Sequence, residues 1–74
     1  MNIDENKIDE FALALLYLTI HDEYRAWKQI DFETMNRLHE KGLIQNPVNK
    51  SKSVVFTETG LKKSKELFEK YLSK

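Results

Sequence analysis

Apolar residues near the start of the chain recur three and four positions apart, which predicts an α-helix there. Asp4 or Asn6 can cap its first turn. Leu13, Leu16 and Tyr17 extend the apolar surface around this helix, so we expect it to be buried on more than one side, by its own domain or by a second copy of the chain. The main apolar face consists of Ile8, Phe11, Ala12, Leu15 and Leu18.

A second helix is predicted from Asp31 to Lys41. Asp31 is a typical N-cap residue, and Ile30 and Met35 are placed on either side of it as a hydrophobic staple. Gly42 can take the left-handed conformation that commonly ends a helix. The apolar stripe of this helix consists of Phe32, Met35, Leu38 and His39.

The stretch between these two helices, residues 21–30, has a weaker pattern. Tyr24, Trp27 and Ile30 recur every third position, which is consistent with a short helical turn. The stretch is short and polar, so its structure stays open. We expect Trp27 to pack in the core between the helices. The alternative is that Trp27 and Tyr24 form a surface on which nucleic-acid bases stack.

A β-hairpin is predicted after the second helix. Residues 43–44 open a short apolar segment, and residues 53–57 contain the β-branched and aromatic side chains of a second strand. The connection, residues 46–52, is longer than a tight turn and carries Lys50 and Lys52 but no acid. We therefore expect it to project as a flexible basic tip.

A last helix can begin at Thr57, a suitable N-cap residue. Its core face consists of Leu61, Ser64, Phe68, Tyr71 and Leu72. The predicted class is therefore α+β, in the order helix, short helical turn, helix, two-stranded antiparallel hairpin, helix. With 74 residues and no cysteine, the chain fits a single domain, residues 1–74, that is held together by packing or by self-association.

Two segments, Leu38 to Ile44 and Val54 to Leu61, together resemble winged-helix regulators. In those proteins a recognition helix ends in Lys-Gly-Leu-Ile and a wing leads into Leu-Thr-x-x-Gly, whereas here Phe56 replaces the usual leucine. The resemblance covers residues 31–72 and implies a winged-helix-like domain. One departure is that residues 21–30 leave little room for the supporting helix of a helix-turn-helix.

The chain is also similar, over nearly its full length, to a small bacterial family of stand-alone domains whose function is unassigned. Four stretches carry this similarity: Ala14 to Thr19, Arg25 to Lys28, Arg37 to Gly42 and Lys52 to Val55. The similarity implies no particular activity.

Charge is distributed unevenly along a chain that is neutral overall. Residues 1–23 contain six acids against Lys7 alone, a net charge of −5, which leaves +5 on the remainder. Such polarity can steer a partner, but the overall balance is less basic than is usual for nucleic-acid binders. Both duplex DNA and a protein therefore stay open as partners.

In the first hypothesis the chain is a small winged-helix DNA-binding or transcription-associated protein. The helix from Asp31 to Lys41 would enter the major groove, and the hairpin tip would contact phosphates. The net charge of that helix is −1, so phosphate attraction would have to come from elsewhere. The residues assigned to DNA are Thr34, Asn36, Arg37 and Lys41 on the helix and Lys50 and Lys52 at the tip.

In the alternative hypothesis the chain is a protein–protein interaction module or a homodimer that does not bind nucleic acid. A second copy would then cover Leu13, Leu16 and Tyr17 on the first helix, because that helix carries more apolar surface than one face requires.

No enzymatic activity, cofactor, metal site or small-molecule substrate is expected. His21, Asp22 and Glu23 are consecutive, so their side chains diverge, and a metal would need a further ligand such as His39. Neither histidine has a cysteine or serine at a recognisable catalytic spacing. The longest apolar run, residues 11–18, is far shorter than the roughly 20 residues that span a bilayer. We expect a cytoplasmic protein without membrane contact.

Overall fold

Side-chain capping bonds mark the start of two of the three helices, the first and the last, in the computed structural model, which describes residues 1–28 and 30–74. The Asp4 carboxylate accepts the backbone N–H of Lys7 at 3.1 Å, and helix α1 spans Glu5–Leu18. Asp31 is the N-cap of α2, Phe32–Glu40. The Thr57 hydroxyl accepts the N–H of Gly60 at 2.9 Å, and α3 spans Glu58–Leu72. The three predicted helices are confirmed.

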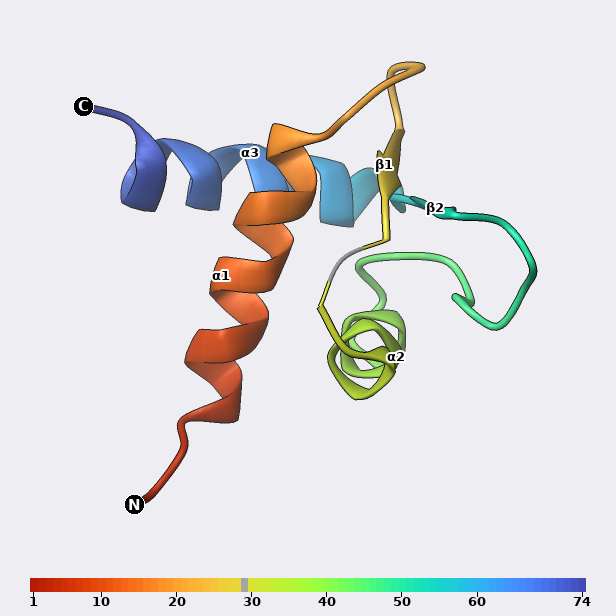
Figure 1. Cartoon of the computed structure of the whole chain (residues 1–74). Coiled ribbons are helices and arrows are strands. Elements are labelled where there is room, and N and C mark those ends of the chain that lie inside the picture. Colours follow the sequence, from red (N-terminus) through yellow and green to blue (C-terminus); the bar gives the residue numbers. More distant parts are fainter. Residues whose placement is uncertain (29) are drawn as a thin grey trace.

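The helices surround a core to which every element contributes. In Figure 1, α3 crosses α1, and α2 lies beside them below the two strands. Helix α1 packs mainly against α3 and to a smaller extent against α2 and the first strand. The buried apolar side chains are Ala12, Leu13, Ala14, Leu16, Ala26, Met35, Leu38, Leu43, Ile44, Val54, Phe56 and Leu67.

The predicted hairpin is reduced to one antiparallel bridge, which is flanked by hydrogen bonds from the Gln45 N–H to the Val55 carbonyl at 2.8 Å and from the Thr57 N–H to the Leu43 carbonyl at 3.1 Å. Strand β2, Ser53–Val55, pairs antiparallel with β1, Arg25–Trp27, so that Ala26 lies opposite Val54. The segment after α2 contributes a single bridge, between Ile44 and Phe56. The fold is nevertheless α+β, with three helices and a two-stranded antiparallel sheet in an arrangement consistent with a winged helix.

The described residues of the stretch 21–30, which are 21–28 and 30, do not form the short helical turn that the three-residue spacing suggested, because strand β1 occupies Arg25–Trp27. Asp22 and Glu23 both have positive φ, 51° and 62°, which reverses the chain in a tight loop. The strand that follows obtains its hydrogen bonds from β2: Phe56 donates its N–H to the carbonyl of Tyr24 at 2.9 Å. Pairing with a segment nearly 30 residues away in the sequence therefore decides the structure of this stretch. The three-residue spacing of its apolar side chains does not.

Candidate functional site

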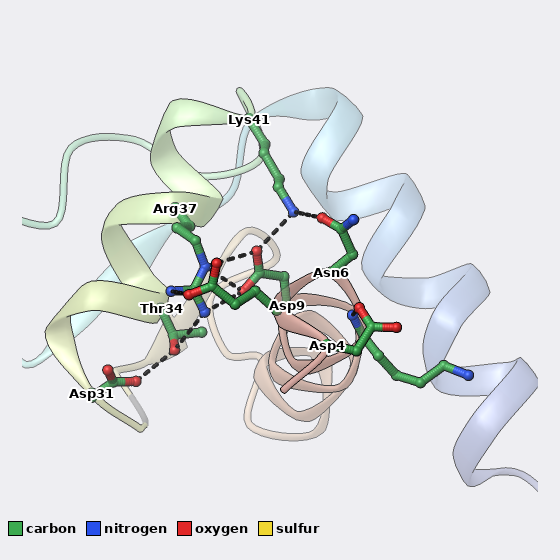
Figure 2. Close-up of polar contacts among 9 residues, drawn as sticks. Asp4, Asn6, Asp9, Asp31, Thr34, Arg37 and Lys41 are labelled. Atoms are coloured by element: carbon green, nitrogen blue, oxygen red, sulfur yellow. Dashed lines mark hydrogen bonds and ion pairs between the residues drawn. The ribbon is translucent and has the colours of Figure 1, made fainter. Parts of the chain in front are cut away.

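A buried carboxylate on α1 binds Arg37 of α2 and Lys41, the C-cap residue of α2, as Figure 2 shows. Asp9 is only 3 % exposed. The Arg37 guanidinium donates to the Asp9 carboxylate through Nε at 3.0 Å and through Nη2 at 2.8 Å. Lys41 donates to the other oxygen of Asp9 at 2.7 Å, and Arg37 also reaches Glu5 at 3.4 Å. This cluster joins α1 to α2.

The charges in this cluster stabilise one another. Burial by itself raises the pKa of Asp9, but the hydrogen bonds and charges of Arg37 and Lys41 outweigh burial and leave the pKa below its ordinary value. The hydrogen bond to Asp9 likewise raises the pKa of Arg37. Asp9 is therefore ionised at neutral pH and satisfied by two cations.

The other two residues of α2 that were assigned to DNA also have partners within the chain. Thr34 is 2 % exposed, and its hydroxyl donates to the carboxylate of Asp31 at 2.5 Å, which lowers the pKa of Asp31. Asn36 is half-buried and donates to Glu40 at 2.9 Å. The side chains that α2 exposes are Phe32, Glu33 and Glu40, and Lys41, the exposed residue that ends the helix, is ion-paired with Asp9.

Lys50 and Lys52 lie on the loop that extends away from the helices between α2 and β2 (Figure 1). Asn49 organises this loop by accepting the N–H of Ser51 at 2.8 Å, and Lys28 reaches it from the end of β1, with its ammonium 3.2 Å from two oxygens of Asn49. Within the described residues, none of these three lysines lies within ion-pair distance of an acid. We call Lys28, Lys50 and Lys52 the basic wing.

Trp27 lies on the surface, so the expectation that it packs in the core is wrong. Side chains alternate along β1, and Ala26 takes the core position while Arg25 and Trp27 face outward. Trp27 is 51 % exposed and stacks on the ring of His21, with 4.3 Å between the ring centroids and 26° between the ring planes. We call Trp27 and His21 the Trp27 platform. Tyr24 nearby is 45 % exposed.

Two of the three residues assigned to a dimer interface are buried within this chain, and the third is half-buried. Leu13 and Leu16 are at most 1 % exposed, and Tyr17 is half-buried against Phe68, with ring centroids 5.3 Å apart. The additional apolar surface of α1 is covered by α3 and the sheet of the same chain, so a second copy cannot reach these leucines.

Exposed apolar side chains gather instead where the start of α1 meets the start of α2. Ile3, Ile8 and Ile30 line a hollow of about 480 Å³. Ile30 has a φ of 61°, a strained conformation for a β-branched residue. Three acids share the lining: Glu5, Asp31 and Glu33. We call this hollow the isoleucine groove.

Sequence reasoning did not assign roles to Asp9, Lys28 or His21. Asp9 did leave a signal, because it lies at helical spacing from the buried Ala12, Leu13 and Leu16, and an acid on an apolar face requires a cation. Lys28 and His21 left none, since only the unforeseen strand brings them to the wing and to Trp27.

Two kinds of site are absent from the part of the chain that the structure describes. No three histidine, cysteine or acidic side chains gather there as ligands for a metal ion. The helices there are too short or too polar to cross a bilayer. His39 directs Nδ1 at the carbonyl oxygen of Ile44, 3.1 Å away, which is consistent with a structural role at the edge of the core.

Comparison with known proteins places the chain in a family. A family profile described as "Domain of unknown function (DUF6429)" matches residues 4–74. The chain is 57 % identical to "Uncharacterized protein y4hR" of Sinorhizobium fredii over 74 residues, the full length of both chains. No solved structure matches. The resemblance to an uncharacterised bacterial family is thereby confirmed.

Proposed function

The chain belongs to the family DUF6429, and from its geometry we propose that it is a non-enzymatic, cytoplasmic module that binds nucleic acid through the basic wing and not through α2. The observation that carries this proposal is the contrast between two sets of cations. Arg37 and Lys41 are bound to a buried carboxylate, whereas the three lysines of the basic wing have no acidic partner among the residues that the structure describes.

The wing is suited to phosphates because its positive charge is concentrated and uncompensated. Residues 41–57 contain lysines but no acid, and the loop extends from the body of the protein where a ligand can reach it (Figure 1). Phosphate contacts of this kind release counterions, which gives binding a steep dependence on salt. Overall neutrality does not oppose it, since the acids are concentrated in residues 1–23.

The test is to measure how the binding of a fluorescently labelled oligonucleotide depends on salt, by anisotropy. We expect K50Q/K52Q to weaken binding and to lower the slope of log K against log salt by about 1 for each lysine that contacts a phosphate. The matched control is K62Q/K65Q, which removes the same charge from exposed positions on α3.

The control separates a local contact from a general effect of charge. We expect K62Q/K65Q to bind nearly as the unaltered protein does. An equal loss in both double variants would mean that net charge alone governs binding, and binding that does not change with salt would remove the proposal altogether.

A second candidate function is contact with a protein, and the isoleucine groove favours it. The groove exposes Ile3 and Ile30 by 64 % and 57 % beside three acids. Exposed apolar surface with a charged border is typical of protein interfaces. The occupant we propose is a second copy, whose α3 carries four lysines that complement those acids: Lys62, Lys63, Lys65 and Lys70.

Sedimentation velocity over a range of protein concentrations tests this second function. We expect reversible association that weakens as salt rises and that is lost in Ile30→Asn. Asparagine tolerates positive φ, so this variant removes the apolar side chain while relieving strain. Its free energy of unfolding should not fall. A monomer at every concentration would exclude the second copy.

A further inference from the structure

We propose that Trp27 stacks on an unpaired base, so that the ligand of this surface is single-stranded nucleic acid. This inference rests on the proposed function and names its substrate class. It starts from the position of the indole, which occupies the outward face of β1 while the inward face is closed by Ala26. A large, half-exposed aromatic side chain on a sheet surface is the feature that single-strand binders use to hold bases.

The indole is stacked on His21 and stays half exposed. His21 stacks on Trp27 at 4.3 Å, yet half of the Trp27 side chain stays exposed. Across the ladder its neighbour is Ser53, which has a small side chain. A planar base can therefore extend the stack that His21 and Trp27 begin.

The platform is held in place before any ligand arrives. His21 and Arg25 exchange two backbone hydrogen bonds, at 2.7 and 3.1 Å. The backbone N–H of Trp27 donates to the hydroxyl of Thr19 at 3.3 Å. The loop between His21 and Arg25 includes Asp22 and Glu23, both with positive φ. An aromatic surface that is already ordered loses little conformational freedom on binding, which favours affinity.

Charges around the platform suit a sugar–phosphate backbone. Arg25 is on the same face as Trp27, and its pair with Asp22 is weak because both side chains are exposed and 3.7 Å apart. At the other side of Trp27, the N–H of Lys28 donates to the carbonyl of Lys52 at 2.8 Å, which places two residues of the basic wing at the end of the ladder. A strand whose base lies on Trp27 thus has cations on either side.

Duplex nucleic acid does not fit this arrangement. In a duplex the faces of the bases are stacked on one another, so the indole has no face to contact, whereas unpaired bases expose theirs. Reading a duplex would instead require an element that enters a groove, and Arg37 of α2 and Lys41 at its C-cap are both bound to Asp9.

Trp27 is the single tryptophan of the chain, so its fluorescence reports contact directly. The probes are a 12-nucleotide oligo(dT), the corresponding oligo(rU) and a hairpin duplex carrying the same number of phosphates. We expect both single strands to quench the fluorescence and to bind more tightly than the duplex does. The relative affinities of the two single strands identify DNA or RNA as the better ligand.

Variants are then compared by the anisotropy of labelled oligo(dT). We expect Trp27→Ala to weaken binding between about 5-fold and 150-fold, the range observed for the loss of one stacked base, and Trp27→Phe to retain most of the affinity. Phe32→Ala removes an aromatic side chain that is 57 % exposed on α2 and should leave the affinity unchanged. Circular dichroism verifies that each variant is folded.

The outcomes separate this inference from the function on which it rests. Binding that needs Lys50 and Lys52 but is equally tight for the hairpin, or is unaffected in Trp27→Ala, would overturn the stacking proposal and leave nucleic-acid binding intact. If neither single strands nor the duplex bind at low salt, both proposals fail.

Discussion

Gly60→Ala is expected to unfold the protein or to leave it barely stable. A Cβ atom at this position would lie 1.6 Å from the carbonyl oxygen of Leu43 and 2.5 Å from its carbonyl carbon. Both are backbone atoms, and the same carbonyl accepts the N–H of Thr57 at 3.1 Å, so the chain there cannot move aside without losing a hydrogen bond. The start of α3 is therefore packed directly on the segment after α2.

The expected loss exceeds about 3 kcal/mol, the upper end of the usual cost of overpacking. A chain of this length has roughly 4 to 11 kcal/mol of total stability. Urea unfolding followed by circular dichroism measures the change. The control is Gly42→Ala, where an added Cβ meets nothing within 4 Å and only the positive φ of 77° is unfavourable, at about 1–2 kcal/mol. Similar losses in the two variants would contradict the argument.

Asp9→Asn is expected to have the second largest effect. The substitution removes the negative charge that holds Arg37 and Lys41 against α1, and it leaves those cations facing a neutral amide at the helix interface. Breaking a fully buried ion pair typically costs 3–5 kcal/mol. Because the two cations reach solvent, we expect about 2–3 kcal/mol here. Glu5→Gln is the matched control, since Glu5 contacts Arg37 from an exposed position and should contribute little.

The same cluster predicts how stability depends on pH. The pKa of Asp9 is lower in the folded protein than its ordinary value of 3.8, so the unfolded chain takes up a proton first as the pH falls. The contribution of Asp9 to the free energy of unfolding is complete above pH 3.8 and is lost as the pH drops through the pKa of Asp9 in the folded protein. Below pH 3.8 the free energy of unfolding should therefore fall less steeply with falling pH in Asp9→Asn than in the unaltered protein. Identical pH dependence in the two proteins below pH 3.8 would show that the cluster does not contribute to stability.

The helices and their limits could be predicted from the sequence, because the signals that determine them are local. Asp4, Asp31 and Thr57 are N-cap residues, and Gly42 has the positive φ that a helix end requires. Capping and apolar periodicity act over a few residues and need no distant partner. The helical part of the α+β class followed from them.

The sheet and the candidate site could not be predicted in this way. Trp27 was expected in the core because of its size, but the pairing of Ala26 with Val54 sets which side chains of β1 point inward. Arg37 and Lys41 were expected to face DNA, but Asp9, about 30 residues earlier, binds both.

From the sequence alone followed the helices, the acidic first third and the basic loop at residues 46–52. Tertiary structure alone decided which cations are available to a ligand and that Trp27 is at the surface. The physical reason is range: capping bonds join residues three or four apart, whereas the register of a strand and the partner of a buried charge depend on groups that only the folded chain brings together.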